Sequence, residues 1–348
     1  MITVNCIGVG HWGPNLVRAF AVQSNSRVST VCDLSEERLQ LVKRSIPTIE
    51  RITHDAESAI RDTAADAVVI ATPTSTHYEL TKLALESGKH VLVEKPLARS
   101  AAEAEELVEL SARVGRLLAV GHVFLFNNGI RGVRNLIRNG ELGRIHYAFA
   151  ARTNLGPFRD DVNAMWDLAS HDISILNYWL DEDPLNVSAR GGRFLTDSVE
   201  DVVVASFGYP NGIMASVHVS WLNPRKVREI TVVGDKKMVV WNDMDLNEPI
   251  RVYHRGVDID RAPLYSDTFG TFRMQVRTGD VVIPHIAGAE PLAEQCRHFL
   301  ACVEGRERLL NDATLGLRVV RALEAVDQSL ANGSAQVDVS RGSANKPA

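Results

Sequence analysis

The first 120 residues alternate between two hydrophobic patterns. Short apolar runs rich in β-branched residues are typical of buried strands, and between them apolar residues recur at helical spacing. Repeated strand–helix–strand units predict right-handed crossovers and a parallel sheet covered by helices on both faces. We therefore expect a doubly wound α/β domain over residues 1–121. Its strands are expected within 2–9, 27–33, 66–71, 89–94 and 117–121, and its helices within 13–24, 35–45, 76–87 and 100–114.

The pattern changes after residue 121. In residues 184–254 several apolar strands follow one another without helices between them, which predicts a mostly antiparallel, open sheet. The turn signal "YPNG" at 209–212 predicts a hairpin between two of these strands. We therefore expect an α+β domain for substrate binding and oligomerisation over 122–335, followed by a flexible tail at 336–348. Its helices are expected near 127–139, around His171, near 291–304 and at 314–331, where the last can pack back on the first domain, with a strand near 143–151 and an irregular stretch at 255–288.

Composition narrows the class of protein. With 348 residues, 45% hydrophobic and 23% charged, the chain is typical of a soluble protein of about two domains. Its net charge of −5 provides no overall attraction to nucleic acid or to an anionic membrane. No apolar run reaches membrane-spanning length. The four cysteines show neither CxxC nor metal-ligand spacing, and structural disulfides are not expected, which suits a reducing compartment. We expect a cytoplasmic protein without a metal that acts on a small molecule.

The stretch "CIGVGHWGPN" contains the pattern Gly-x-Gly-x-x-Gly directly after the first predicted strand. Such glycines allow a tight turn and the close approach of a pyrophosphate to the positive end of the next helix, as in Rossmann domains. Asp33 follows twenty residues after Gly13, where a carboxylate accepts hydrogen bonds from ribose hydroxyls and repels a 2′-phosphate. This favours NAD over NADP, against the alternative of a phosphate-free turn with a surface aspartate. The expected cofactor contacts here are Gly8, Gly10, His11, Trp12, Gly13 and Asp33.

Two further strand ends carry polar residues, in "VVIATPTSTH" and "HVLVEKPLA". Ligands of doubly wound sheets bind at the carboxyl ends of the strands, so both stretches are expected to line the cofactor site. A lysine beside the positive nicotinamide and partly removed from water would favour its neutral form and could transfer protons. For His77 a simple helix start is an equally good interpretation, and Lys95 could be a surface lysine in a turn. The expected cofactor contacts are Thr72, Pro73, His77, Glu94, Lys95 and Pro96.

The stretch "WDLASHDISIL" places Asp167 four positions before His171. In a helix these two residues share a face, so the carboxylate could orient the imidazole for proton transfer. The alternative is a capped helix with an exposed histidine. Asp172 would point away from this face and make a structural contact.

Polar and aromatic residues also precede this helix, in "ARTNLGPFRDDVNAMW". Arginines on such a segment suit a phosphate or carboxylate, and a tryptophan can stack on a sugar or simply pack. The expected substrate contacts are Arg152, Asn154, Arg159 and Trp166. Two basic clusters, one of Arg131, Arg134 and Arg138 and one of Arg225, Lys226 and Arg228, are interpreted as solvated faces, with anion binding as the alternative.

The glycine loop, "ATPTSTHYELTKLALESGKHVLVEKPLA", "GHVFLFN" and the Asp-x-x-x-His helix together resemble the Gfo/Idh/MocA family over nearly the whole chain. The family is named for glucose–fructose oxidoreductase and inositol dehydrogenase. The resemblance implies that Lys95 and His171 form a proton-transfer pair oriented by Asp167, and that the Lys95–Pro96 bond is cis. It also implies an open sheet that packs against another subunit, in a homodimer or homotetramer. Ala169 and Ser174 depart from the family's usual glycine and acid.

The resemblance further implies an NAD-dependent oxidoreductase that transfers hydride between nicotinamide and a ring hydroxyl or ketone of a sugar. The likeness is greatest to members that act on nucleotide sugars, often at the 3-hydroxyl. One alternative is an inositol, cyclitol or free-sugar dehydrogenase, or a keto-sugar reductase. An alternative of another class is a non-catalytic NAD-binding sensor, which would not need Lys95, Asp167 and His171 together.

Overall fold

The computed structural model describes residues 1–195, 197–259 and 274–339. The chain forms two compact units, one of Met1–Asn127 with Ala289–Glu324, and one of the described residues of Asn128–Gly288 with 325–339. The sequence-based division put all of 122–335 in the second domain. Instead, helix α8 (Pro291–Val303) and the first part of α9 (Ala313–Ala331) belong to the first unit.

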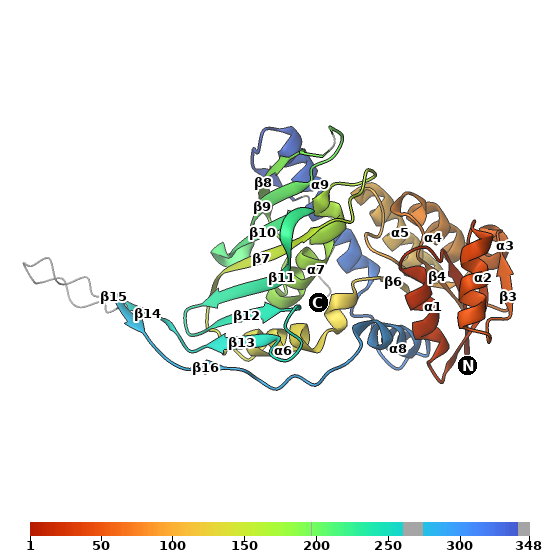
Figure 1. Ribbon diagram of the computed structural model, residues 1–348, viewed down its shortest axis with the longest axis horizontal. Coiled ribbons are helices and arrows are strands. Elements are labelled where there is room, and N and C mark those ends of the chain that lie inside the picture. Colours follow the sequence, from red (N-terminus) through yellow and green to blue (C-terminus); the bar gives the residue numbers. More distant parts are fainter. Residues whose placement is uncertain (196, 260–273, 340–348) are drawn as a thin grey trace, which may run out of the picture. The chain divides into compact units, whose positions relative to one another are not determined.

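The first unit is built on a six-stranded parallel sheet of order β3-β2-β1-β4-β5-β6 (Figure 1). The strand order reverses between β1 and β4, which is the topological switch point where such sheets bind ligands at their carboxyl ends. The expected doubly wound fold is confirmed. Its strands are β1 (Ile2–Ile7), β2 (Ser26–Cys32), β3 (Arg51–Thr53), β4 (Ala67–Ile70), β5 (His90–Val93) and β6 (Leu118–Val120), and its helices include α1 (Gly13–Ala21), α2 (Glu36–Ser45), α3 (Ala56–Ile60), α4 (His77–Glu86) and α5 (Ala101–Val114).

The short elements β3 and α3 are absent from the sequence prediction. Strand β3 has three residues and pairs with β2 at the edge of the sheet, so it needs no apolar run of its own. Helix α3 has five residues and is capped by Asp55, whose carboxylate accepts from the Ser58 backbone N at 2.9 Å. Elements this short have too few positions to show a periodicity.

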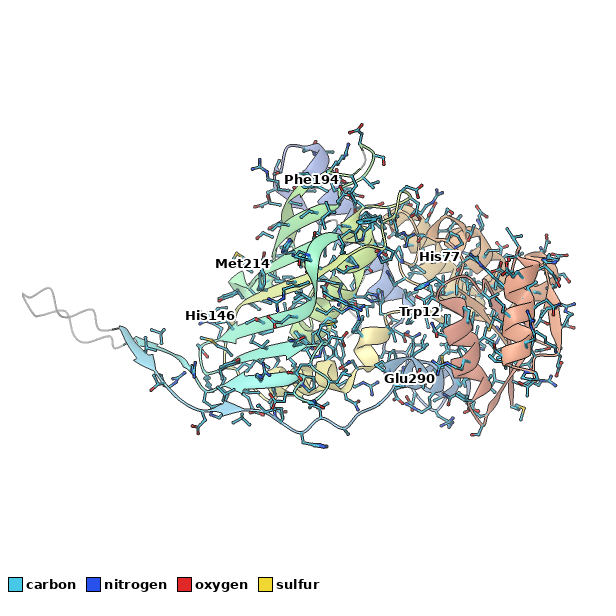
Figure 2. The ribbon with its side chains drawn as sticks, in the orientation of Figure 1. Trp12, His77, His146, Phe194, Met214 and Glu290 are labelled. Carbon is cyan, nitrogen blue, oxygen red and sulfur yellow. The ribbon has the colours of Figure 1, made fainter. Side chains whose placement is uncertain are left out.

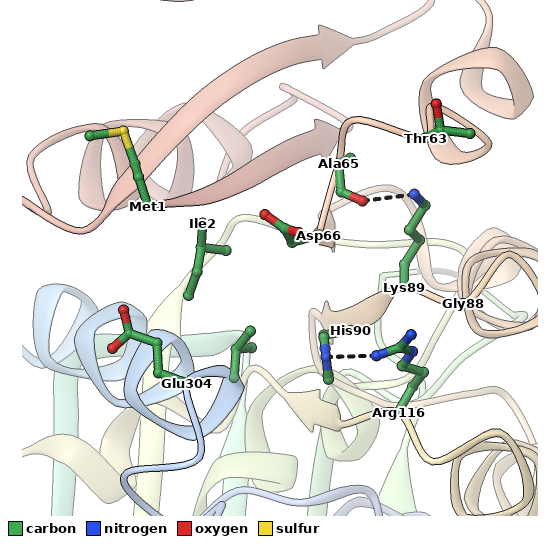
Figure 3. A pocket seen from close by; sticks show the side chains of 11 residues that line it. Met1, Ile2, Thr63, Ala65, Asp66, Gly88, Lys89, His90, Arg116 and Glu304 are labelled. Atoms are coloured by element: carbon green, nitrogen blue, oxygen red, sulfur yellow. Dashed lines mark hydrogen bonds between the residues drawn. The ribbon is translucent and has the colours of Figure 1, made fainter.

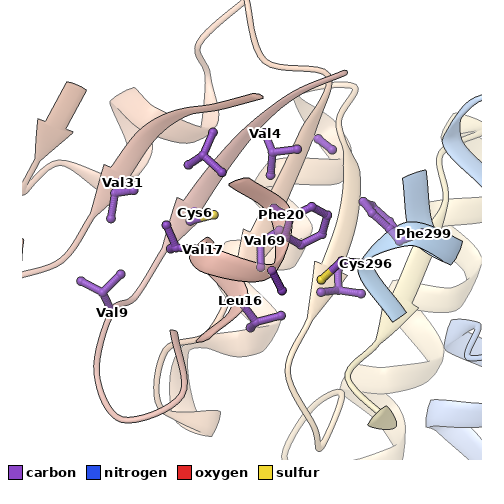
Figure 4. Close-up of a cluster of buried hydrophobic side chains, with 14 of the residues drawn as sticks. Val4, Cys6, Val9, Leu16, Val17, Phe20, Val31, Val69, Cys296 and Phe299 are labelled. Atoms are coloured by element: carbon purple, nitrogen blue, oxygen red, sulfur yellow. The ribbon is translucent and has the colours of Figure 1, made fainter. Parts of the chain in front are cut away.

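The core of the first unit explains why α8 belongs to it. Figure 4 shows side chains of β1 and α1 packed together with Cys296 and Phe299 of α8. The rings of Phe20 and Phe299 pack edge to face, with their centroids 6.1 Å apart. Cys6 behaves as a buried apolar residue, and burial raises the pKa of its thiol to about 12. The sequence shows that α8 has an apolar stripe, but not which surface the stripe covers.

The second unit is built on a nine-stranded sheet of order β16-β13-β12-β11-β7-β10-β9-β8-β17 (Figure 1). Strands β7 and β10 are parallel, and the other neighbouring pairs are antiparallel, which confirms the predicted mostly antiparallel sheet. Helix α6 contacts β12 and helix α7 contacts β7. The elements are α6 (Asn128–Arg138), β7 (Ile145–Leu155), α7 (Ser170–Leu180), β8 (Asn186–Gly192), β9 (Val202–Gly208), β10 (Met214–Ser220), β11 (Leu222–Gly234), β12 (Met238–Asn242), β13 (Ile250–Tyr253), β16 (Val281–Val282) and β17 (Val337–Asp338).

The hairpin predicted at "YPNG" is confirmed: β9 and β10 pair in antiparallel fashion, and Asn211 takes the left-handed conformation at φ 61°. The stretch 255–288 is less irregular than expected, because β14 (Gly256–Ile259) pairs with β15 (Met274–Arg277) and β16 joins the main sheet. Val337 and Asp338, which the sequence prediction placed in the tail, instead form β17 and pair with β8. Of the expected irregular stretch and tail, 260–273 and 340–348 lie outside the described residues.

Candidate functional site

The glycine loop between β1 and α1 shows which of its glycines the protein itself requires. Gly8 has φ +90°, and a Cβ there would lie 2.7 Å from the backbone of Ala71. A Cβ on Gly13 would lie 2.1 Å from the Gly8 carbonyl oxygen. At Gly10 a Cβ would meet only Arg38 Nη1 at 3.6 Å, so the space above this glycine is open.

The open space at Gly10 fits a dinucleotide. In a Rossmann loop the middle glycine is the one that lets the backbone approach a pyrophosphate. Helix α1 follows directly, and its N-cap residue Trp12 makes no side-chain capping hydrogen bond. The backbone N–H groups at this helix start therefore have no side-chain cap, and they form an anion-binding end.

Asp33 follows β2 and is fixed by two backbone donors. Its Oδ2 accepts from Val9 N at 2.7 Å, and its Oδ1 accepts from Ser35 N at 2.9 Å. A carboxylate has about four acceptor positions, so both oxygens keep capacity for ribose hydroxyls. The glycine loop is thus joined to the end of β2, as NAD recognition requires. A cation also lies beside the glycine loop. It is the exposed Arg38 on α2, whose Nη1 would lie 3.6 Å from a Cβ placed on Gly10.

His77 has a different position from the expected cofactor contact. It is buried, with Nδ1 2.8 Å from the Pro96 carbonyl oxygen and Nε2 2.9 Å from the Thr72 carbonyl oxygen. Both ring nitrogens therefore face backbone acceptors, and the side chain braces the segment after β4 against the segment after β5. An imidazole held in this way supports the two segments of the candidate cofactor site through their backbones, instead of lining the site with its side chain.

Glu94 and Lys95 follow β5, and the Lys95–Pro96 bond is cis, as expected. Burial raises the pKa of the Glu94 carboxyl to about 7, although Lys95 and hydrogen bonds from its backbone and from the Trp12 side chain act in the opposite direction. A Cβ on Gly121 would lie 2.7 Å from Glu94 Oε2, so this carboxyl lies against the end of β6. Glu94 thus connects the glycine loop with the ends of β5 and β6.

His122, at the end of β6, is a site residue that the sequence analysis missed. It is buried, and burial followed by the charge of Lys95 lowers its pKa to about 3, so the imidazole is neutral. Within the described part of the chain its two ring nitrogens have no hydrogen-bond partner. An orphaned buried polar group of this kind is expected to be satisfied by water or ligand. The sequence offered two signals: its place directly after the predicted strand that ends at Gly121, and its presence in "GHVFLFN", one of the stretches that carry the family resemblance.

In the second unit, the helix that carries His171 begins irregularly. Residues Met165–Ala169 form a π-helical turn, and α7 starts at Ser170. The wider turn corrects the expectation that Asp167 and His171 stack as in an α-helix, although such turns are frequent at functional sites. Asp167 Oδ2 accepts from Trp221 Nε1 at 3.2 Å, and its Oδ1 accepts from Arg159 Nη1 at 3.4 Å. Trp221, between β10 and β11, was not predicted as a site residue.

Asp172, next to His171, makes a structural contact, as expected, and its partner is Arg152. The guanidinium donates from Nε at 2.8 Å and from Nη2 at 2.9 Å to the two carboxylate oxygens. The side chains are only 4% and 2% exposed. An arginine buried in this way is not available to a substrate anion, which corrects the role expected for Arg152. The pair instead fastens the first turn of α7 to β7, and thereby positions His171.

The other three expected substrate residues are also engaged. Trp166 is buried and donates from Nε1 to Asp327 at 2.6 Å, so it packs and does not offer a face to a sugar. Arg159 pairs with Asp161 at 2.6 Å, and this hydrogen bond raises the pKa of the guanidinium. The Asn154 amide donates to the Gly156 carbonyl oxygen.

A hollow of about 530 Å³ lies elsewhere in the first unit (Figure 3). Ile2, Asp66 and His90 line it from the amino ends of β1, β4 and β5, opposite to the ends that carry the glycine loop and Glu94. Lys89 is satisfied there by the carbonyl oxygens of Asp62 and Ala65, at 2.6 and 2.7 Å. The hollow is therefore separate from the candidate cofactor site.

Comparison with known families matches both units. The model of an oxidoreductase family with an NAD-binding Rossmann fold matches residues 2–122. The model of the GFO/IDH/MocA C-terminal domain matches residues 130–240. Within the described residues, no helix is both long and apolar enough to cross a membrane.

Individual relatives are enzymes that act on sugars and cyclitols. UDP-N-acetylglucosamine 3-dehydrogenase of Acidithiobacillus ferrooxidans is 28% identical over 329 residues, which cover 91% of this chain and 93% of that protein. An inositol 2-dehydrogenase of Acidiphilium cryptum is 27% identical, covering 73% of this chain and 76% of the relative. The solved structure of GenD2 from gentamicin A biosynthesis in complex with NAD has a TM-score of 0.80 at 22% identity, over 97% of this chain and 96% of that one, which shows the shared fold.

Proposed function

The chain belongs to the Gfo/Idh/MocA family of NAD-binding oxidoreductases, and we propose that it oxidises or reduces a ring carbon of a nucleotide-linked sugar. The relative at 28% identity that acts on UDP-N-acetylglucosamine supports the 3-hydroxyl of a UDP-linked N-acetylhexosamine as the reacting group. The inositol dehydrogenase at 27% identity supports a cyclitol as the second candidate. The first is preferred because its likeness extends over 91% of the chain, against 73% for the second.

The observation that carries the proposal is that one chain has both a site suited to a dinucleotide and an acidic residue held in place beside a histidine-bearing helix. The first unit has an open, anion-binding glycine loop joined to Asp33. The second unit has Asp167 held by Trp221 and Arg159 at the start of the helix that carries His171. A sensor that only bound NAD would need the first site alone.

Bound NAD supplies the chemistry of hydride transfer, and the protein's residues manage the proton. Oxidation of a secondary alcohol removes a proton as the hydride leaves, so a positioned base is required. We assign Lys95 and His171 as the acid–base residues and Asp167 as the group that orients the imidazole.

The test is turnover measured by NADH absorbance, with UDP-N-acetylglucosamine, UDP-N-acetylgalactosamine, free N-acetylglucosamine and inositols offered separately. We expect turnover with a UDP sugar. His171→Ala should lower kcat by about 10²–10⁴-fold, the usual contribution of positioned proton transfer, while NAD affinity measured by calorimetry is retained. A wild-type protein that binds NAD but turns over none of these compounds would support the sensor and refute the enzyme.

We also infer that the protein is a cytoplasmic homo-oligomer. The face of the second-unit sheet opposite α6 and α7 carries apolar side chains on adjacent strands, at 40–52% exposure. Met214 pairs with Tyr147, so the two lie on the same face (Figure 2 labels Met214). An exposed apolar patch across several strands usually marks an interface. The four free, buried cysteines suit a reducing compartment. The patch residues are Tyr147, Phe149, Val204 and Met214.

A further inference from the structure

A large bulge interrupts the pairing of β11 with β7. Leu222 pairs with Leu155 and Val227 pairs with Thr153, so the four residues 223–226 of β11 lie opposite the single residue Asn154. Bulges redirect side chains and are frequent beside active sites. This bulge contains Pro224, which has no N–H for a ladder bond, and two exposed cations, Arg225 and Lys226. We call residues 223–226 the basic bulge.

The backbone of the basic bulge is held in place. Thr153 Oγ1 donates to the Arg225 carbonyl oxygen at 3.2 Å, and Arg225 N donates to Asn223 Oδ1 at 3.0 Å. The first bond joins the bulge to β7 and the second holds its turn from within, while the two charged side chains stay exposed. Anchored cations lose less conformational entropy when they bind an anion than cations on a flexible loop.

Arg225 and Lys226 are cations that the fold leaves available. Across residues 1–195, 197–259 and 274–339, neither makes an ion pair with a carboxylate. The nearby Arg228 is paired with Asp243 at 3.0 Å. The arginines that the sequence suggested for an anion, Arg152 and Arg159, are paired with aspartates. Of the five cations compared, only the two in the basic bulge are not paired with a carboxylate of the described residues, so these two are available to bind an anion.

The basic bulge is connected to Asp167, the residue assigned to orient His171. Trp221 directly precedes β11, and its indole donates to Asp167 at 3.2 Å. Its carbonyl oxygen accepts from Gly156 N at 3.0 Å, which fastens the segment after β7 to the same place. That segment exposes Phe158, with 52% of its surface open to solvent, beside Gly156. Phe158, Arg225 and Lys226 thus belong to two segments that meet at Trp221, the hydrogen-bond partner of Asp167, within one unit.

We propose that the basic bulge is the diphosphate subsite of the substrate site, with Arg225 and Lys226 binding the phosphates and Phe158 offering its ring to the base. This proposal rests on the proposed function, because a nucleotide-linked sugar joins a base, a diphosphate and the reacting sugar in one molecule. Charged donors form the strongest hydrogen bonds to phosphate oxygens, and aromatic rings bind bases by stacking. A free cyclitol has neither group and would leave the basic bulge without a ligand.

The first test uses UDP as the probe and isothermal titration calorimetry as the assay. The double variant R225Q/K226Q should bind UDP about 10–100-fold more weakly than the wild type, since each exposed charged hydrogen bond contributes up to about tenfold. The matched control is R144Q/R190Q, which removes two exposed cations of the same unit outside the basic bulge. The control should bind UDP as the wild type does. Circular dichroism and melting temperature establish that both variants are folded.

A second variant separates the two parts of the subsite. Phe158→Ala should weaken UDP binding and leave the binding of inorganic pyrophosphate unchanged, since stacking involves the base alone. In turnover assays, R225Q/K226Q should raise KM for a UDP sugar more than it lowers kcat, because binding to the phosphates is equal in the ground and transition states. An equal fall in UDP affinity for the control and the double variant would refute the subsite.

The outcomes distinguish this proposal from the proposed function. If the wild type binds UDP through the basic bulge but turns over no UDP sugar, the subsite stands and the proposed function fails. If UDP sugars are turned over with the same KM by wild type and R225Q/K226Q, the function stands and the subsite is refuted. A change in sedimentation of R225Q/K226Q with unchanged UDP affinity would identify the basic bulge as a subunit contact, which also refutes it.

Discussion

The buried pair Arg152–Asp172 allows a quantitative prediction about the helix that carries His171. Its two side chains are 4% and 2% exposed and joined by two hydrogen bonds of 2.8 and 2.9 Å. Asp172→Asn keeps the shape of the side chain but leaves the guanidinium charge buried without its counter-ion. Breaking a buried pair in this way costs about 3–5 kcal/mol, against a typical total stability of about 5–15 kcal/mol.

The assay is urea denaturation, from which the free energy of unfolding is obtained for each variant. Asp172→Asn should lower it by about 3–5 kcal/mol, and the double variant R152M/D172L should lose less, because it removes both charges and fills the space with apolar atoms. At temperatures where Asp172→Asn is still folded, kcat should also fall, because the first turn of α7 is no longer fastened to β7. A merely structural pair would change stability and leave kcat unchanged.

The control is Glu141→Gln, which makes the same change from carboxylate to amide in an exposed pair. Glu141 and Lys237 lie 3.0 Å apart with side chains 39% and 25% exposed. Pairs in contact with water contribute about 0–1 kcal/mol, so the loss should be small. If Asp172→Asn destabilised the protein no more than Glu141→Gln, the reasoning from burial would be refuted.

Three further predictions concern other parts of the molecule. Because burial raises the pKa of Glu94 to about 7, the folded state favours the protonated carboxyl, and stability present below pH ~4.5 should be lost as pH rises through about 7. Urea denaturation across this range should show the loss in the wild type and not in Glu94→Gln. Asp33→Ser should weaken NADH binding and improve NADPH binding, because Arg38 remains beside the loop; unchanged dissociation constants would contradict the role of Asp33. Phe149→Glu should convert the proposed oligomer to a monomer in sedimentation velocity, and a wild-type monomer at micromolar concentration would exclude the interface.

The parts of the fold that sequence reasoning identified are those with a local cause. The strand–helix alternation follows from apolar periodicity. The glycine pattern could be recognised because the structure leaves no room for a side chain at Gly8 or Gly13, so these two positions must be glycine. The short β3 and α3 escaped because three and five residues carry too little pattern. The position of α8 escaped for another reason. Its apolar stripe shows that it is buried, whereas the packing of Phe299 against Phe20 depends on the return of the chain across more than two hundred residues.

The same distinction applies to the candidate site. Asp167 and His171 lie four positions apart, so an α-helical stacking of the two could be predicted. The residues at these positions do not reveal that Met165–Ala169 form a π-helical turn instead. Trp221 could not be found, because nothing in a lone tryptophan between two strands indicates its hydrogen bond to Asp167. Arginines 152 and 225 differ in the same way. Their residue type suits an anion equally well, and only the packing of β7 on α7 decides which of them keeps its charge exposed.

Arg152 is buried and Arg225 is exposed because the two residues occupy different kinds of position in the sheet. Arg152 lies on the same face of β7 as Ala148 and Ala150, which are buried toward the helices. Its side chain must therefore also enter the interior. A charge buried there requires a partner, and Asp172 on α7 supplies one. Arg225 lies where β11 leaves its register, so the pleat does not force its side chain inward. The bulge, more than the residue type, is what makes Arg225 and Lys226 available to a diphosphate.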